Sequence, residues 1–91
     1  MKFYVYKTTW KVYHKNHLED KDEDASAIIF KTKVEACDSL KSLMHRYIKD
    51  CDYRVIEVTQ DKFWIAKTIH HSESDFGNTF EIVGEVKEIN L

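Results

Sequence analysis

The run EDKDED at positions 19 to 24 places five carboxylates and one lysine in six positions. Asp20, Asp22 and Asp24 have the D-x-D-x-D spacing that opens a calcium loop. An EF-hand then needs glycine at loop position 6 and glutamate at position 12, where this chain has alanine and lysine. We therefore expect no metal and no cofactor. The remaining interpretations are a solvated loop and an acidic contact surface for a partner.

Histidines and cysteines do not form a zinc pattern in this chain. His14-x-x-His17 and the pair at 70–71 lack the thiolate pairs of structural zinc sites. Cys37 and Cys51 fall on the apolar side of a predicted helix, where 14 residues separate them by about 21 Å. That distance is beyond disulfide reach, so both thiols are expected to be free, as in a reducing cytoplasm.

Nucleophilic catalysis would need a nucleophile, a base and an orienting group that converge in a pocket. His70, His71 and Ser72 could be drawn as a triad with Glu73 or Asp75. Neighbours within one short connection seldom converge in that geometry, and a small sheet with one helix has little depth for a pocket. We expect that the protein is not an enzyme.

Aromatic and basic residues alternate near the beginning of the chain. Tyr4, Tyr6 and Trp10 lie among several lysines, including Lys7. Aromatics on an open sheet face beside cations are typical of single-stranded nucleic-acid binding. One alternative function is therefore single-stranded RNA or DNA binding through Tyr4, Tyr6 and Lys7. The opposing interpretation is that these aromatics cover the sheet beneath a helix.

Hydrophobic periodicity predicts the elements that must position these residues. The spacing T-x-x-E at Thr32 and Glu35 is a capping box, and apolar residues then recur every three or four positions, which predicts a helix over 33–50. Alternation and apolar runs predict strands at 2–14, 27–31, 53–59, 62–69 and 79–89, with 15–26 as a polar loop.

The order β-β-α-β-β-β predicts a two-layer α+β fold, in which a single helix covers one face of a mostly antiparallel sheet of about five strands. At 91 residues we expect a single compact domain, 1–91. No apolar stretch approaches the length of a membrane span, and no signal peptide is evident, so a cytoplasmic protein without membrane contact is expected.

A small, proline-free chain rich in Lys, Asp and Glu resembles the accessory proteins of bacteriophages, many of which inhibit a host enzyme or defence complex by binding it. That resemblance implies a host-cytoplasmic inhibitor that acts by direct protein–protein contact. A structural homodimer is a further alternative. The expected partner-binding residues are the acidic loop and three aromatics: Glu19, Asp20, Asp22, Glu23, Asp24, Tyr6, Trp10 and Trp64.

Overall fold

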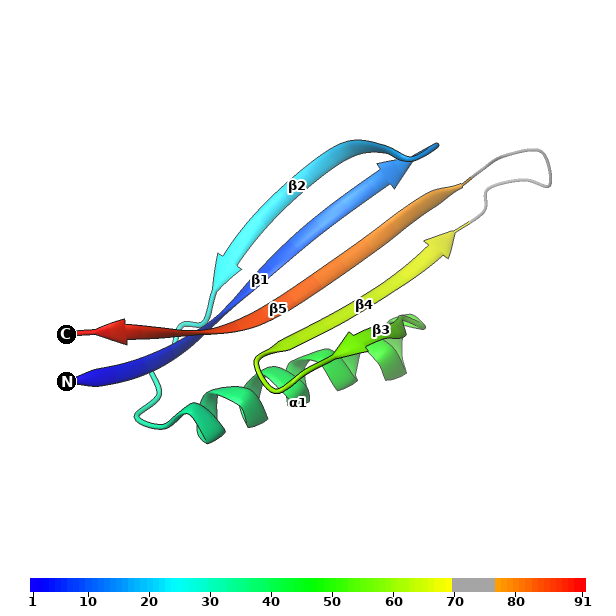
Figure 1. Ribbon diagram of the computed structural model, residues 1–91. Coiled ribbons are helices and arrows are strands. Elements are labelled where there is room, and N and C mark those ends of the chain that lie inside the picture. Colours follow the sequence, from blue (N-terminus) through cyan, green and yellow to red (C-terminus); the bar gives the residue numbers. More distant parts are fainter. Residues whose placement is uncertain (70–76) are drawn as a thin grey trace.

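Five antiparallel strands form one sheet in the order β2-β1-β5-β4-β3, with one helix packed on it (Figure 1). The computed structural model describes residues 1–69 and 77–91. The elements are β1 (Lys2–His14), β2 (His17–Ala25), α1 (Lys33–Cys51), β3 (Arg54–Val58), β4 (Lys62–Ile69) and β5 (Asn78–Asn90). This architecture confirms the predicted α+β fold and the β-β-α-β-β-β order.

The helix begins and ends where its caps place it. Thr32 is extended, with φ −125°, and its hydroxyl accepts a hydrogen bond of 3.2 Å from the Glu35 amide, as the capping box predicts. Asp52 adopts the left-handed conformation, with φ 59°, and its backbone N–H bonds the Tyr47 carbonyl. The predicted helix of 33–50 is therefore confirmed to within one residue.

The core lies between α1 and the three middle strands of the sheet. Leu40 and Met44 project from the helix onto Phe63 of β4 and Ile82 of β5, and all four are buried. Gly84 of β5 lies directly beneath the helix, since a Cβ atom at this position would be 2.5 Å from a Leu40 methyl carbon. The missing side chain lets the helix approach the sheet closely.

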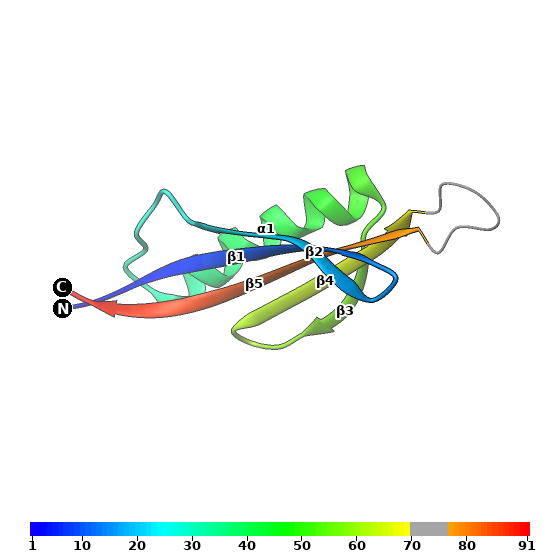
Figure 2. The same cartoon turned by 90° about the horizontal axis from the view of Figure 1, so that it is seen from above.

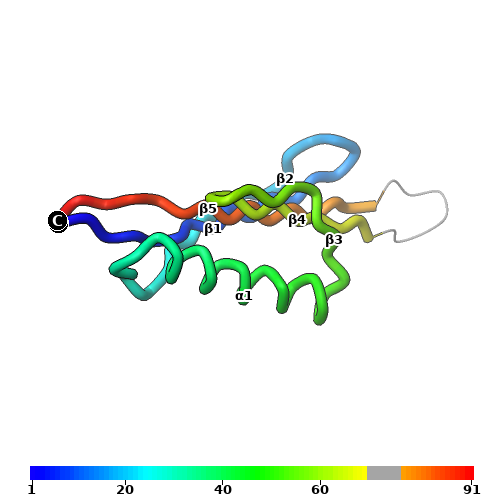
Figure 3. Tube along the Cα trace, turned by 60° about the horizontal axis from the view of Figure 1, so that its bottom comes forward, coloured from blue at the N-terminus to red at the C-terminus, as the bar shows by residue number. Residues whose placement is uncertain are grey.

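One face of the sheet is covered by α1 and the other by no element of the described chain (Figure 3). We call these faces the helix side and the open side. The helix packs against β1, β5 and β4, whereas every residue of β2 is exposed. β2 and β3 form the two margins, and Figure 2 shows β1 and β5 running together to one end of the sheet.

The acidic run is a strand, which corrects the predicted loop at 15–26. Lys15 and Asn16 both have positive φ, 51° and 65°, and form the two-residue turn that leads β1 directly into β2. Aspartate and glutamate have low strand propensity, but pairing with β1 supplies the backbone hydrogen bonds. Charged side chains also suit an edge strand because they discourage pairing with other molecules.

The segment 27–31 is not the strand that its apolar composition predicts. Only Phe30 pairs with the sheet, through an isolated bridge to Tyr4 with two backbone hydrogen bonds of 2.8 Å. Ile28 and Ile29 are exposed. β2 already pairs with this edge of β1 from Lys7 onwards, so the segment 27–31 can pair only with the first residues of β1.

Within the part of the chain that the structure describes, no helix is long and apolar enough to cross a bilayer.

Candidate functional site

Strand alternation divides the acidic run between the two faces of the sheet. Residues directly opposite each other in an antiparallel pair point to the same face. The three aspartates of β2 lie opposite helix-side residues of β1, and we call them the acidic ladder. The pairs are Asp20 with Val12, Asp22 with Trp10, and Asp24 with Thr8.

The acidic ladder carries uncompensated charge. No ion pair involves Asp20, Asp22 or Asp24 among residues 1–69 and 77–91. Each Oδ1 atom instead accepts a hydrogen bond of 2.9 Å from the backbone N–H of the next residue, which holds the carboxylates in one orientation. Two residues of strand advance about 7 Å, so the ladder presents three exposed carboxylates at a regular spacing.

Glu23 lies on the other face and its charge is balanced. Its carboxylate pairs with Lys7 at 3.0 Å and with Lys21 at 3.8 Å. The hydrogen bond and charge of Lys7 lower the pKa of Glu23 below the ordinary carboxyl value. Glu19 falls where the β1–β2 register shifts, and it is exposed. The five predicted acidic residues therefore do not form one surface.

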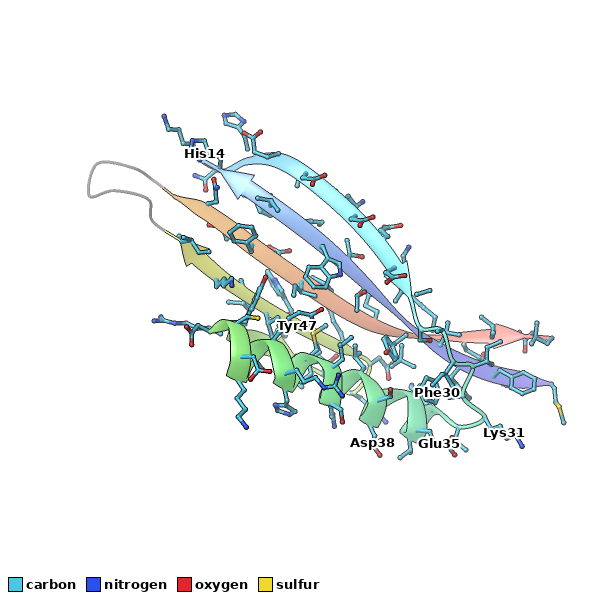
Figure 4. The ribbon with its side chains drawn as sticks, turned by 180° about the vertical axis from the view of Figure 1, so that it is seen from behind. His14, Phe30, Lys31, Glu35, Asp38 and Tyr47 are labelled. Atoms are coloured by element: carbon cyan, nitrogen blue, oxygen red, sulfur yellow. The ribbon has the colours of Figure 1, made fainter. Side chains whose placement is uncertain are left out.

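Trp10 borders the acidic ladder. It is half-buried, and its ring meets Tyr47 of α1 edge to face, with centroids 5.0 Å apart and planes at 84°. Figure 4 shows Tyr47 pointing from the helix toward the sheet, while Glu35 and Asp38 point away from it. Burial raises the pKa of Tyr47. Trp10 thus connects the core to the acidic margin.

Tyr6 also lies on the helix side, but nearer the beginning of β1 than Trp10. Its ring stacks on Phe30, with centroids 6.2 Å apart, so the segment 27–31 partly covers it. Tyr4 bridges to Phe30 on the same side, whereas Lys7 points to the open side and reaches Glu23. The three residues of the nucleic-acid alternative therefore do not share a face.

Trp64 lies on the open side, away from the ladder. It is directly opposite Val83 of β5 and Glu57 of β3, and the Lys62 ammonium lies 5.5 Å from its ring centroid. Its Nε1 atom is buried and has no hydrogen-bond partner among residues 1–69 and 77–91. An open recess of about 290 Å³ runs past Trp64. Three lysines and three glutamates line it: Lys11, Lys21, Lys62, Glu23, Glu81 and Glu85.

Two features of the surface do not follow from the linear sequence. Tyr47 lies at the three- and four-residue spacing of the apolar helix face, yet its ring also reaches the margin where Trp10 meets the acidic ladder. Val55, Ile56 and Val58 are predicted as an ordinary strand, yet about half of each side chain is exposed. Alternation could have assigned Asp20, Asp22 and Asp24 to one face, had the acidic run been predicted as a strand.

The remaining candidates are the metal ligands, the two cysteines and the polar residues at 70–75. Among the described residues, no three His, Cys, Asp or Glu side chains lie close enough to hold a metal. Cys37 is half-buried and donates to the Gln60 carbonyl at 3.3 Å. Cys51 is exposed, which corrects its prediction as a residue of the buried helix face, and both thiols are free. His70, His71, Ser72, Glu73 and Asp75 lie outside the described residues.

Comparison of the chain with protein families, curated proteins and solved structures gave no match.

Proposed function

We propose that the protein is a non-enzymatic protein-binding module whose contact surface is the acidic ladder together with Trp10. The observation that carries the proposal is the juxtaposition of three uncompensated carboxylates with a half-buried tryptophan on one face of the β1–β2 hairpin. Interfaces combine an aromatic anchor with a polar rim, and Trp10 and the ladder supply these two parts.

The partner of such a surface is a protein with a basic groove. Three carboxylates at a spacing of about 7 Å favour a row of lysines or arginines over a single cation. Uncompensated charge steers encounter and adds specificity, so binding weakens as salt increases. A basic groove that normally holds nucleic acid would be blocked by the ladder, which is consistent with inhibition of a host enzyme or defence complex by occlusion.

The open side supports single-stranded nucleic-acid binding less well. Stacking would require exposed aromatics next to unpaired cations. Lys7 and Lys87 are instead paired with Glu23 and Glu85, at 3.0 and 2.9 Å. Trp64 lies among residues of both charges.

The test compares the wild type with an isosteric charge-neutral ladder. The variant D20N/D22N/D24N keeps the Oδ1 acceptors and removes three charges. The control E35Q/D38N/D50N removes three charges from the exposed surface of α1. Tagged forms of all three proteins are used to capture partners from bacterial lysate with and without nuclease treatment, and the affinity of the recovered protein is then measured at low and high salt.

We expect the wild type and the control to retain one stoichiometric protein. The ladder variant should bind it roughly tenfold more weakly, because each exposed charge pair contributes up to about 1 kcal/mol. Trp10→Ala should also weaken binding. Equal affinity of the ladder variant at low salt would contradict the proposal. Loss of all captured material on nuclease treatment would favour the nucleic-acid alternative.

A further inference from the structure

The two margins of the sheet have opposite chemistry. β2 is lined by charged residues, which protect an edge from pairing. β3 forms the other margin, and three of its five exposed residues are apolar: Val55 is 50% exposed, Ile56 52% and Val58 47%. An exposed apolar edge strand has unpaired backbone groups on its outer side and is a ready site for strand addition. The β3 edge is therefore the part of the sheet that is suited to accept another strand.

β3 also carries two charged residues, Arg54 and Glu57. Arg54 and Glu57 take part in no ion pair among the described residues. Residues three apart in a regular strand point to opposite faces, but the extra residue Ile56 changes the alternation. Arg54 lies opposite Ala66 and Glu57 opposite Trp64, so both charges point to the open side.

We propose that the β3 edge binds the β3 edge of a second copy of this chain. An antiparallel pair related by a two-fold axis places the Arg54 end of one strand beside the Glu57 end of the other. Arg54 of each copy then lies beside Glu57 of the other copy, so the two-fold symmetry gives two pairs of opposite charge. Val55, Ile56 and Val58 lie along the same contact and lose part of their exposed apolar surface.

The resulting dimer has one continuous sheet of ten strands. A two-fold axis perpendicular to the sheet keeps both helices on the same side. β2 remains at each outer margin, so the two acidic ladders lie at opposite ends of the assembly. The self-association proposed here does not depend on the proposed function, because it uses the other margin of the sheet.

Sedimentation velocity over a wide range of protein concentration tests the inference. The wild type should show a concentration-dependent monomer–dimer equilibrium. Ile56→Lys should abolish the dimer, because it adds a charge at the middle of the contact. Arg46→Glu on the exposed surface of α1 is the control and should leave the equilibrium unchanged. A wild type that remains monomeric at every concentration would overturn the inference.

Reversing the charges of β3 tests the proposed antiparallel orientation of the two strands. Arg54→Glu and Glu57→Arg should each weaken self-association about tenfold or more, since each places like charges together at both ends of the contact. An equimolar mixture of the two variants should form a heterodimer as readily as the wild type dimerises, because opposite charges then meet at both ends. Circular dichroism verifies that each variant is folded. A mixture that associates no better than its components would refute the antiparallel β3 contact.

Discussion

Gly84 lies so close beneath Leu40 that a Cβ atom on the glycine would be 2.5 Å from Leu40 Cδ1 and 2.6 Å from Met44 Cε. Leu40 and Met44 are buried at 3% and 0% exposure, so at least one of these side chains would have to shift within the packed core to accept a methyl group at this position. The contact sets the distance between α1 and β5, and thereby the position of the whole helix on the sheet.

Gly84→Ala should therefore destabilise the protein by about 1–3 kcal/mol, because the core must be overpacked to accept the methyl group. Chemical denaturation measures the change. In a Met44→Ala background, which itself costs about 2–5 kcal/mol, the added methyl group should cost less, since it fills part of the space left by methionine. Additive effects of the two substitutions would show that the close approach does not limit packing.

Removal of the Thr32 hydroxyl should weaken the start of the helix. Thr32→Ala removes the acceptor of the 3.2 Å bond from the Glu35 amide, and we expect a loss of about 1 kcal/mol in the free energy of unfolding. Ser42→Ala, at an exposed position within the helix, is the matched control and should have little effect. Equal losses in both variants would argue against a specific capping role.

Substitutions in the turn between β1 and β2 should increase the stability of the protein. Lysine is poorly suited to the positive φ of 51° at position 15, whereas Asn-Gly is the preferred pair for a two-residue turn with both φ values positive. Lys15→Asn combined with Asn16→Gly should stabilise the protein by about 1 kcal/mol, measured by thermal denaturation. A lower melting temperature would show that contacts of the native turn residues outweigh the backbone preference.

Lys7 should control the titration of Glu23. Lys7→Met should raise the Glu23 pKa toward 4.5, its ordinary value, whereas Lys87→Met should raise the pKa of Glu85 and leave that of Glu23 nearly unchanged. Carboxyl chemical shifts followed by NMR report both values. Because the folded-state pKa of Glu23 is lowered, its pairing stabilises the fold above the ordinary carboxyl pKa. This stabilisation is lost as the pH falls through the lowered pKa.

The sequence predicts the elements whose signals are local. The capping box at Thr32 and the apolar spacing of the helix define α1, and alternating residues define β4 and most of β5. Each signal depends on residues within a few positions of one another. The class of the fold follows, because a single apolar helix face requires an apolar sheet face to cover it.

The acidic run could not be identified as a strand by the same reasoning. Its residues have low strand propensity, and Lys-Asn is a weaker turn signal than Asn-Gly. What makes β2 a strand is its partner β1, together with the Lys7–Glu23 pair. Because the strand was not predicted, neither was the separation of Asp20, Asp22 and Asp24 from Glu23. The sequence therefore predicts which acidic residues are present, but not which of them share one face of the sheet.

The central pairing of β1 with β5 has a consequence for the order of folding. The ladder runs from Lys2 opposite Asn90 to His14 opposite Asn78, so it joins segments that are far apart in sequence. β1 and β2 can form their hairpin as soon as both have left the ribosome, but the other edge of β1 must wait until β5 is synthesised. Long-range pairing of this kind slows folding. Throughout that delay the charged β2 keeps one side of the nascent hairpin from associating with other chains.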